Sequence, residues 1–354
     1  MTNYWVVALT DTAEHPSIQA AAQLLREGKR VAFPTETVYG LGADATNTEA
    51  VESIYQAKGR PADNPLIVHI AHPAQLDALV VGIDAVSQAL IDAFWPGPLT
   101  LVLPVRPGAV SPRVTAGLST VAVRMPAHPI ALQLIEAAGC PLAAPSANRS
   151  GRPSPTRAEH VRDDLDGRIE AILDAGATGV GLESTVVEVV EGCIHILRPG
   201  GITLEQLQPF ATNGLVVGSL VENKEAKNAS PKSPGTKYIH YAPQGILTLV
   251  IGRSSDQVTV QIQQMIDIAQ AKGHSTGILT CSEHIERYQA DLVVPCGSLA
   301  QPETIAQELF AALRSFDAGH ISFIVAESFD EAGIGSAVMN RLQKAAGERI
   351  LRIN

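Results

Sequence analysis

Short β-rich segments alternate with helical segments along most of the chain, and this alternation constrains the fold more than any other feature. Strands and helices in alternation are typical of α/β proteins. The first part of the sequence predicts strands near Val31–Phe33, Leu66–Ile70, Leu99–Leu103, Thr120–Arg124, Thr185–Val190 and Ile194–Leu197. It predicts helices near Ser17–Glu27, Thr48–Ala57, Asp84–Phe94, Pro129–Ala138 and Arg157–Leu165.

The alternation is interrupted once, by residues 212–244, where Asn, Lys, Glu, Ser and Pro gather and the segment ends SPKSPGTKYIHYAP. Pro231, Pro234 and Pro243 exclude a continuous helix there. We therefore expect a domain of residues 1–211, an interdomain linker of residues 212–244 and a second domain of residues 245–354.

The second domain has the more regular pattern. The runs ILTLVI, STGILT, DLVVP and ISFIV predict strands, and helices are expected over Gln257–Ala271, Glu303–Phe316 and Ser336–Ala346. This repeat indicates a Rossmann-like parallel α/β domain. The turn after its first strand reads IGRSSDQ and lacks a G-x-G-x-x-G fingerprint, so no dinucleotide role is expected.

Composition excludes several classes of protein. The chain has 354 residues, enough for about two domains, and 45% of them are hydrophobic. A net charge of −10 opposes nucleic-acid binding through an overall positive field. The sequence has no apolar run long enough to span a membrane and no signal peptide, so we expect a cytoplasmic protein. Four widely spaced cysteines without a C-x-x-C pair predict neither a disulfide framework nor a metal site.

One region departs from the acidic balance. Residues 93–158 contain six arginines and a single acid, Glu136. Guanidinium groups suit the bidentate recognition of carboxylate and phosphate. A chance cluster on a solvated face explains the arginines equally well. The neighbouring motifs must therefore decide between an anion-binding site and a solvated surface. The arginines are Arg106, Arg113, Arg124, Arg149, Arg152 and Arg157.

Two motifs in the first part of the chain carry polar groups next to predicted strands. PTETVYGLGADA follows the strand VAF, and an extended Thr35–Tyr39 would project its three hydroxyls to one side. In KGRPADNPLIVHI, Lys58 and Arg60 could clamp phosphate oxygens or simply end a helix favourably. His69 is a ligand contact or a satisfied structural histidine.

Three later segments add hydroxyls, an amide and further cations. In TVAVRMP, Arg124 ends a strand and could anchor a carboxylate. LAAPSANRSGRPSPT is rich in Ser, Asn, Gly and Pro, with Thr156 as the expected cap of the next helix. The segment GATGVGLEST contains Ser184, and the segment LRPGG contains Arg198. Neither G-x-S-x-G nor H-E-x-x-H occurs, so the sequence predicts a site that binds, orients and neutralises anions.

Taken in order, the segments PTETVYGLG, KGRPADNPL, TVAVRMP, APSANRSGRPSPT, ESTVV and LRPG resemble the YrdC-type domain of L-threonylcarbamoyl-AMP synthases. The linker and the trailing domain are similar to the long, two-domain form of these enzymes. The resemblance implies a twisted open mixed sheet with helices for residues 1–211. It also implies synthesis of threonylcarbamoyl-AMP from L-threonine, bicarbonate or CO2 and ATP, with release of pyrophosphate, as the first step of threonylcarbamoyladenosine modification in tRNAs that read ANN codons.

The resemblance also implies roles for individual residues. The family signature falls on Lys58, Arg60, Ser146 and Asn148, which are the expected catalytic residues. The expected ATP contacts are Lys58, Arg60, Asn64, Thr120, Ser146, Ser154 and Arg198, with Tyr241 or Tyr238 of the linker closing over the nucleotide. The expected L-threonine contacts are Thr37, His69, Arg124, Ala144 and Ser184.

The chemistry of the reaction agrees with this inventory. A carboxylate, a carbamate and a triphosphate must meet in one place, and cations reduce their mutual repulsion. Mg²⁺ is expected to bind mainly through the ATP phosphates, which explains the lack of a carboxylate cage. The product is expected to pass to downstream threonylcarbamoyl-transfer proteins.

Two other functions are weighed against this one. An RNA-binding module is disfavoured because residues 1–210 hold 14 Lys and Arg against 22 Asp and Glu, so weak or no direct tRNA binding is expected. A carbamoyl-adenylate synthase of the hydrogenase-maturation type is disfavoured because the acylphosphatase and zinc-finger segments of those chains are not seen here.

Overall fold

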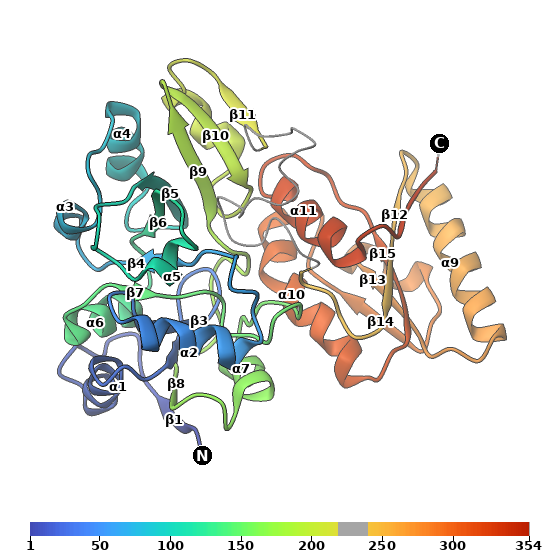
Figure 1. Cartoon of the computed structure of the whole chain (residues 1–354). Helices are drawn as coiled ribbons and strands as arrows, with labels where there is room; N and C mark the ends of the chain where they lie inside the picture. The colour runs from blue at the N-terminus through green and yellow to red at the C-terminus, as the bar shows by residue number, and fades with distance from the viewer. Residues whose placement is uncertain (219–239, 354) are drawn as a thin grey trace. The chain divides into compact units, whose positions relative to one another are not determined.

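The computed structural model of the chain describes residues 1–218 and 240–353 (Figure 1). These residues form two compact units. The first comprises Met1–Ser150, Pro155–Gly179 and the residues from Glu183 to 218; the second comprises Gly151–Ser154, Val180–Leu182 and residues 240–353. Pro231, Pro234 and most of the expected linker lie outside the described residues.

The first unit is built on one mixed sheet with the strand order β1-β8-β2-β3-β7-β4-β6-β5-β9-β10-β11. Neighbouring strands pair parallel in some places, such as β4 with β6, and antiparallel in others, such as β5 with β6. The strands are β1 (Asn3–Val6), β2 (Val31–Phe33), β3 (Gly40–Asp44), β4 (Ile67–His69), β5 (Leu99–Pro104), β6 (Thr120–Arg124), β7 (Leu142–Ala143), β8 (Ala171–Asp174), β9 (Thr185–Val190), β10 (Cys193–Arg198) and β11 (Leu215–Val217).

Helices cover this sheet and bury aliphatic side chains against it (Figure 1). Helices α1 and α6 pack on each other and share a core with β1, β2 and β8. The Asn47 side chain caps the start of α2, and Gly59 ends it in the left-handed conformation, with φ 62°. The helices are α1 (Pro16–Arg26), α2 (Thr48–Lys58), α3 (Leu76–Leu79), α4 (Ala85–Phe94), α5 (Pro112–Thr115), α6 (Pro129–Ala138), α7 (Ala158–Leu165) and α8 (Leu204–Leu207).

The register of the central strands sorts their side chains onto two faces. His69 of β4 lies opposite Arg124 of β6, and Ala122 of β6 lies opposite Val102 of β5. Because directly opposed residues point to the same side of a sheet, these four side chains share one face. The other face carries Val68, Leu101, Val121, Val123 and Val187, which belong to the main core. We call the first of these the polar face.

Strand β10 contains a bulge that changes this alternation. Ile196 pairs with Val187 of β9, and Arg198 pairs with Val186, so the register shifts between Ile196 and Arg198. Two residues of the bulged strand thus oppose one residue of its partner. The shift turns Arg198 to the side of Val186, which is the polar face.

The second unit holds an all-parallel sheet with the order β14-β13-β15-β12-β16. Helix α9 covers one face of it, and α10 and α11 pack together on the other (Figure 1). This is the doubly wound, Rossmann-like arrangement that the sequence predicts. The elements are β12 (Ile246–Ile251), α9 (Ser255–Ala271), β13 (Thr276–Thr280), the short 3₁₀ helix η4 (Ser282–Arg287), β14 (Leu292–Pro295), α10 (Pro302–Ala318), β15 (Phe323–Glu327), α11 (Gly335–Ala346) and β16 (Ile350–Arg352).

Two local predictions are wrong. Residues 35–39 are not extended: the Thr35 hydroxyl accepts from the backbone N–H groups of Thr37 and Val38, which makes a turn, and the Tyr39 hydroxyl donates away from it to the Gly176 carbonyl. The cap position of α7 is Arg157 rather than Thr156. No helix in the described part of the chain is both long and apolar enough to cross a membrane.

Candidate functional site

Arg124 is the charged centre of the polar face. It ends β6 and is almost fully buried. Its Nε donates to the Gly97 carbonyl at 3.1 Å and its Nη1 donates to the Thr37 hydroxyl at 2.8 Å, while Nη2 lies 2.6 Å from a carboxylate oxygen of Glu36. The structure therefore brings Thr37 and Arg124 together, and adds an acid that the sequence analysis did not single out.

The contact between Arg124 and Glu36 is an ion pair rather than an aligned hydrogen bond. Among the described residues, Nη2 of Arg124 and both carboxylate oxygens of Glu36 are buried without a hydrogen-bond partner. A guanidinium edge with unused donors can accept another carboxylate. Arg124 can thus bind an acidic ligand if Glu36 moves aside.

His69 lies next to Arg124 on the polar face and is neutral. Burial, followed by the charge of Arg124, lowers the pKa of His69 to about 3. Its Nδ1 is 3.3 Å from the Ile67 carbonyl, and its ring meets Phe33 edge-on. The imidazole can therefore take part in hydrogen bonds and packing near neutral pH but carries no charge there.

The lowered pKa of His69 predicts a loss of stability in acid. The unfolded chain binds a proton at the ordinary pKa near 6.5, whereas the folded chain resists it down to about 3, so acid favours unfolding between these values. This group alone should cost about 1.4 kcal/mol of unfolding free energy per pH unit in that window. Urea unfolding at pH 6 and pH 5 should show a smaller loss for His69→Asn than for the wild type. A His72→Asn variant, changed at an exposed histidine, should keep the wild-type loss; an equal loss in both variants would contradict the prediction.

Ser184, the residue before β9, and Arg198, the last residue of β10, form a second group. Nη2 of Arg198 donates to the Ser184 carbonyl at 2.9 Å and to its hydroxyl at 3.2 Å. The Ser184 hydroxyl also lies 2.7 Å from the hydroxyl of Thr100 in β5. Thr100 pairs with Val186 of β9, so this group too belongs to the polar face.

Lys58 organises the loop after β7. It is the last residue of α2, and its Nζ donates to the carbonyls of Ser146 and Asn148, both at 2.5 Å. The Ser146 hydroxyl donates to the Asn148 side-chain oxygen. The structure therefore brings Lys58, Ser146 and Asn148 together. Lys58 does more than end a helix favourably, because its ammonium group binds another segment of the chain.

Backbone hydrogen bonds hold this loop beside the turn that carries Thr37. The N–H of Leu41 donates to the Pro145 carbonyl, and the N–H of Ala147 donates to the Tyr39 carbonyl, both at 2.8 Å. Ala144 is fixed by its N–H, which donates to the Ile67 carbonyl of β4. Segments far apart in sequence thus become neighbours at the edge of the polar face.

Arg60 and Asn64 lie in the loop after α2. Arg60 donates to the carbonyls of Asn64 and Pro65 and so braces its own loop. The Asn64 side chain is fully buried, and within the described chain neither of its polar atoms has a hydrogen-bond partner. A buried amide without partners costs free energy, which a ligand could recover by bonding to it.

The remaining predicted site residues are Thr120, Ser154, Tyr241 and Tyr238. Thr120 begins β6, at the opposite end of that strand from Arg124, although it shares the polar face. Ser154 and Tyr241 belong to the second unit, where the Tyr241 ring stacks on Phe310 with 5.2 Å between centroids. Tyr238 lies outside the described residues.

The arginine-rich stretch does not act as one patch. Of the arginines whose contacts are described, Arg113 pairs with Glu52 at an exposed position, and Arg106 donates to backbone carbonyls near α3. Arg124 alone of these three lies on the polar face. The arrangement as a whole offers a buried guanidinium, a buried ammonium, hydroxyls and amides, which suit anionic ligands.

Two family models together match nearly the whole chain. The model Sua5_yciO_yrdC, described as "Telomere recombination", matches residues 23–200. A second model, described as "Threonylcarbamoyl-AMP synthase, C-terminal domain", matches residues 202–347.

Curated relatives of similar length resemble the chain throughout. Threonylcarbamoyl-AMP synthase of Bacillus subtilis is 53% identical, with 99% of each chain covered. The Pyrococcus abyssi enzyme of the same name is 47% identical, covering 98% of this chain and 99% of its own. A crystal structure described as P. abyssi Sua5 complexed with L-threonine is 45% identical, covers 100% of both chains and superimposes with a TM-score of 0.89. This similarity confirms the expected YrdC-like fold of the first unit.

Proposed function

Because the chain belongs to the threonylcarbamoyl-AMP synthase family, we propose that it makes L-threonylcarbamoyl-AMP from L-threonine, bicarbonate or CO2 and ATP, releasing pyrophosphate. The observation that carries the proposal is similarity over the full length to enzymes of that name. The anion-binding character of the polar face supports it, since two of the three substrates and the intermediate are anions.

We assign L-threonine to the end of the polar face around Arg124. The unused Nη2 donor of Arg124 would bind the substrate carboxylate in place of Glu36. The Thr37 hydroxyl, already bonded to the same guanidinium, would accept or donate beside it. His69, Ser184 and the backbone around Ala144 complete the proposed threonine contacts.

We assign ATP to the loop that Lys58 holds. Lys58 and Arg60 would face the phosphates, and Ser146 and Asn148 would orient them. The unpartnered amide of Asn64 suits a polar part of the nucleotide. Arg198 and Thr120 complete the proposed contacts.

The donors in this group are cations, hydroxyls and amides, which fit phosphate oxygens better than a naked divalent ion. A Mg²⁺ ion would accordingly be held through the ATP phosphates that Lys58 and Ser146 position, and it would neutralise charge on the triphosphate. The carboxylate of Glu36, which lies beside the proposed threonine contacts, is engaged by Arg124.

The reaction requires positioning more than covalent help from the protein. The threonine nitrogen attacks CO2 and loses a proton, which gives a carbamate. A carbamate oxygen then attacks the α-phosphorus of ATP, the bond to the bridging oxygen breaks, and pyrophosphate leaves. Arg124 and Lys58 would hold the reacting anions together against their repulsion.

The product is a mixed anhydride that reacts readily with nucleophiles. We propose that this chain catalyses the first step of threonylcarbamoyladenosine formation in tRNAs that read ANN codons, and that other proteins transfer the group. The acidic balance of residues 1–210 supports weak or no direct tRNA binding by this chain.

A substrate-omission assay tests the proposal. Pyrophosphate release should require ATP, L-threonine and bicarbonate together, and each omission should reduce the rate to background. The nucleotide product should be L-threonylcarbamoyl-AMP by mass spectrometry. Equal release of pyrophosphate from ATP alone would contradict the proposed function.

A further inference from the structure

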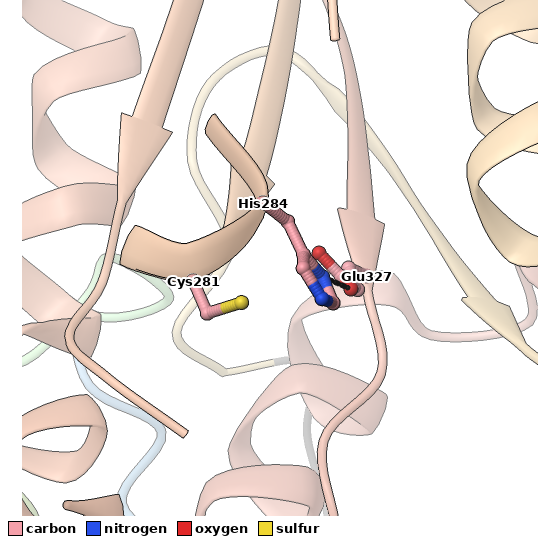
Figure 2. Close-up of side chains that lie close together, drawn as sticks. All are labelled: Cys281, His284 and Glu327. Carbon is pink, nitrogen blue, oxygen red and sulfur yellow. Dashed lines mark hydrogen bonds and ion pairs between the residues drawn. The ribbon is translucent and has the colours of Figure 1, made fainter. Parts of the chain in front are cut away.

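Three potential metal ligands meet at the carboxyl edge of the sheet in the second unit. Cys281 directly follows β13, His284 lies in η4, and Glu327 is the last residue of β15 (Figure 2). Strands β13 and β15 are parallel neighbours, with Leu279 opposite Ala326, so their ends bring the three residues to one place. In open α/β sheets this edge is where ligands bind.

The local backbone explains why Cys281 and His284 point the same way. The N–H of His284 donates to the Cys281 carbonyl at 3.2 Å, which closes a single tight turn. Residues three apart in a 3₁₀ turn lie nearly one above the other. A Cys-x-x-His sequence after a strand therefore presents a sulfur and a ring nitrogen on one side, facing Glu327 (Figure 2).

The geometry is compact and buried. One ligand atom from each of the three residues lies within 4.8 Å of the other two. Cys281 is 0%, His284 8% and Glu327 5% exposed. Nδ1 of His284 is 2.5 Å from one oxygen of Glu327, and the Thr280 hydroxyl donates to the other oxygen. Supporting hydrogen bonds of this kind fix the ligands of metal sites.

We propose that Cys281, His284 and Glu327 bind a divalent transition-metal ion of the zinc class. A thiolate, an imidazole nitrogen and a carboxylate oxygen are zinc ligands, whereas calcium and magnesium prefer oxygen alone. Three protein ligands leave a fourth position open, as in zinc sites that bind water or a small ligand. The spacing of the cysteines predicts no metal site, because it leaves His284 and Glu327 out of account.

The charges of the three ligands suit a divalent ion. Binding would displace the thiol proton of Cys281, and one thiolate, one carboxylate and a neutral imidazole would then balance the two charges of the ion.

The same edge of the sheet carries a small apolar pocket of about 120 Å³. The loops after β14 and β15 line it, through Leu299 and Phe329, together with the first turns of α10 and α11. Glu283, in η4 beside His284, accepts from the backbone N–H of Leu299 at 3.0 Å and so ties η4 to the pocket wall. This edge therefore carries a small hollow whose lining residues differ from the three proposed ligands.

Cobalt titration of the full-length protein tests the site. After treatment with a chelator, Co²⁺ should bind with one ion per chain and produce a thiolate-to-cobalt charge-transfer band in the near ultraviolet, which Zn²⁺ then removes. Cys281→Ser should abolish the band, and Glu327→Gln, which keeps the thiol, should weaken binding at least about 10-fold. Cys193→Ser, changed at a cysteine of the first unit, should bind as the wild type does.

A second readout covers the event that Cys281→Ser folds poorly. Zn²⁺ should raise the melting temperature of the wild type and of Cys193→Ser, and should raise it much less in Glu327→Gln. The proposal is overturned if the wild type shows no charge-transfer band, or if the band persists at full strength in Cys281→Ser. Pyrophosphate release is not part of the readout, so failure here leaves the proposed synthase activity untouched.

Discussion

Replacing Arg124 with alanine should raise the KM for L-threonine about 100-fold, while the KM for ATP stays within a few-fold of the wild-type value. The lost group is a buried guanidinium whose Nη2 is proposed to donate a charge-assisted hydrogen bond to the substrate carboxylate, worth about 1.5–3 kcal/mol. Steady-state pyrophosphate release, with each substrate varied in turn, measures both constants.

The arginine also supports Thr37 and neutralises Glu36, so the variant needs controls. Arg113→Ala removes an arginine from the same stretch whose ion pair with Glu52 is exposed, and it should leave both constants unchanged. The double variant Arg124→Ala/Glu36→Gln removes the carboxylate left unpaired and should keep the high KM for threonine. Equal increases for both substrates would refute the carboxylate role of Arg124.

The second large effect is expected at Lys58. Lys58→Met should reduce kcat for pyrophosphate release by roughly 100- to 1,000-fold, the usual loss when one buried group that stabilises transition-state charge is removed. Methionine has a similar length and polarisability but no charge, so the packing at the end of α2 changes little. The loss has two causes. The variant lacks the ammonium near the phosphates, and the loop of Ser146 and Asn148 loses the two hydrogen bonds that Lys58 donates to its carbonyls.

Lys29→Met is the matched control, because Lys29 is exposed and lies outside the site. It should retain the wild-type kcat. Thermal unfolding of both variants separates a loss of chemistry from a loss of folded protein. A Lys58→Met enzyme that folds and retains more than about a tenth of the wild-type kcat would contradict the proposed role.

Helices and strands with clear periodicity are predictable from this sequence. Helix α6 begins with Pro129 at its first position and is followed by Gly139 in the left-handed conformation, as its sequence predicts. Strand β3 is not predictable from its sequence, GLGAD. This sequence has two glycines and an aspartate, and both residue types are rare in strands. Its strand conformation comes from pairing with β2 and β7 rather than from local preference.

The polar face is predictable only in part. Alternation along TVAVR predicts that Arg124 lies on one face of the sheet and that Val121 and Val123 lie on the other face, in the core. The structure confirms this placement. The contact of Arg124 with Glu36 is not predictable, because it depends on how a turn folds over the end of a distant strand. Cys281 and His284 carry a visible Cys-x-x-His signal, but Glu327 joins them only through strand order.

The bulge in β10 decides which way Arg198 points, because two residues, Leu197 and Arg198, take the place of one after Ile196. If this stretch straightened into a strict two-residue alternation with both residues kept, the guanidinium of Arg198 would turn toward the aliphatic core. Other side chains in this stretch can therefore vary over evolution, whereas a change that removes the bulge but keeps both residues would lose the packing and the cation together.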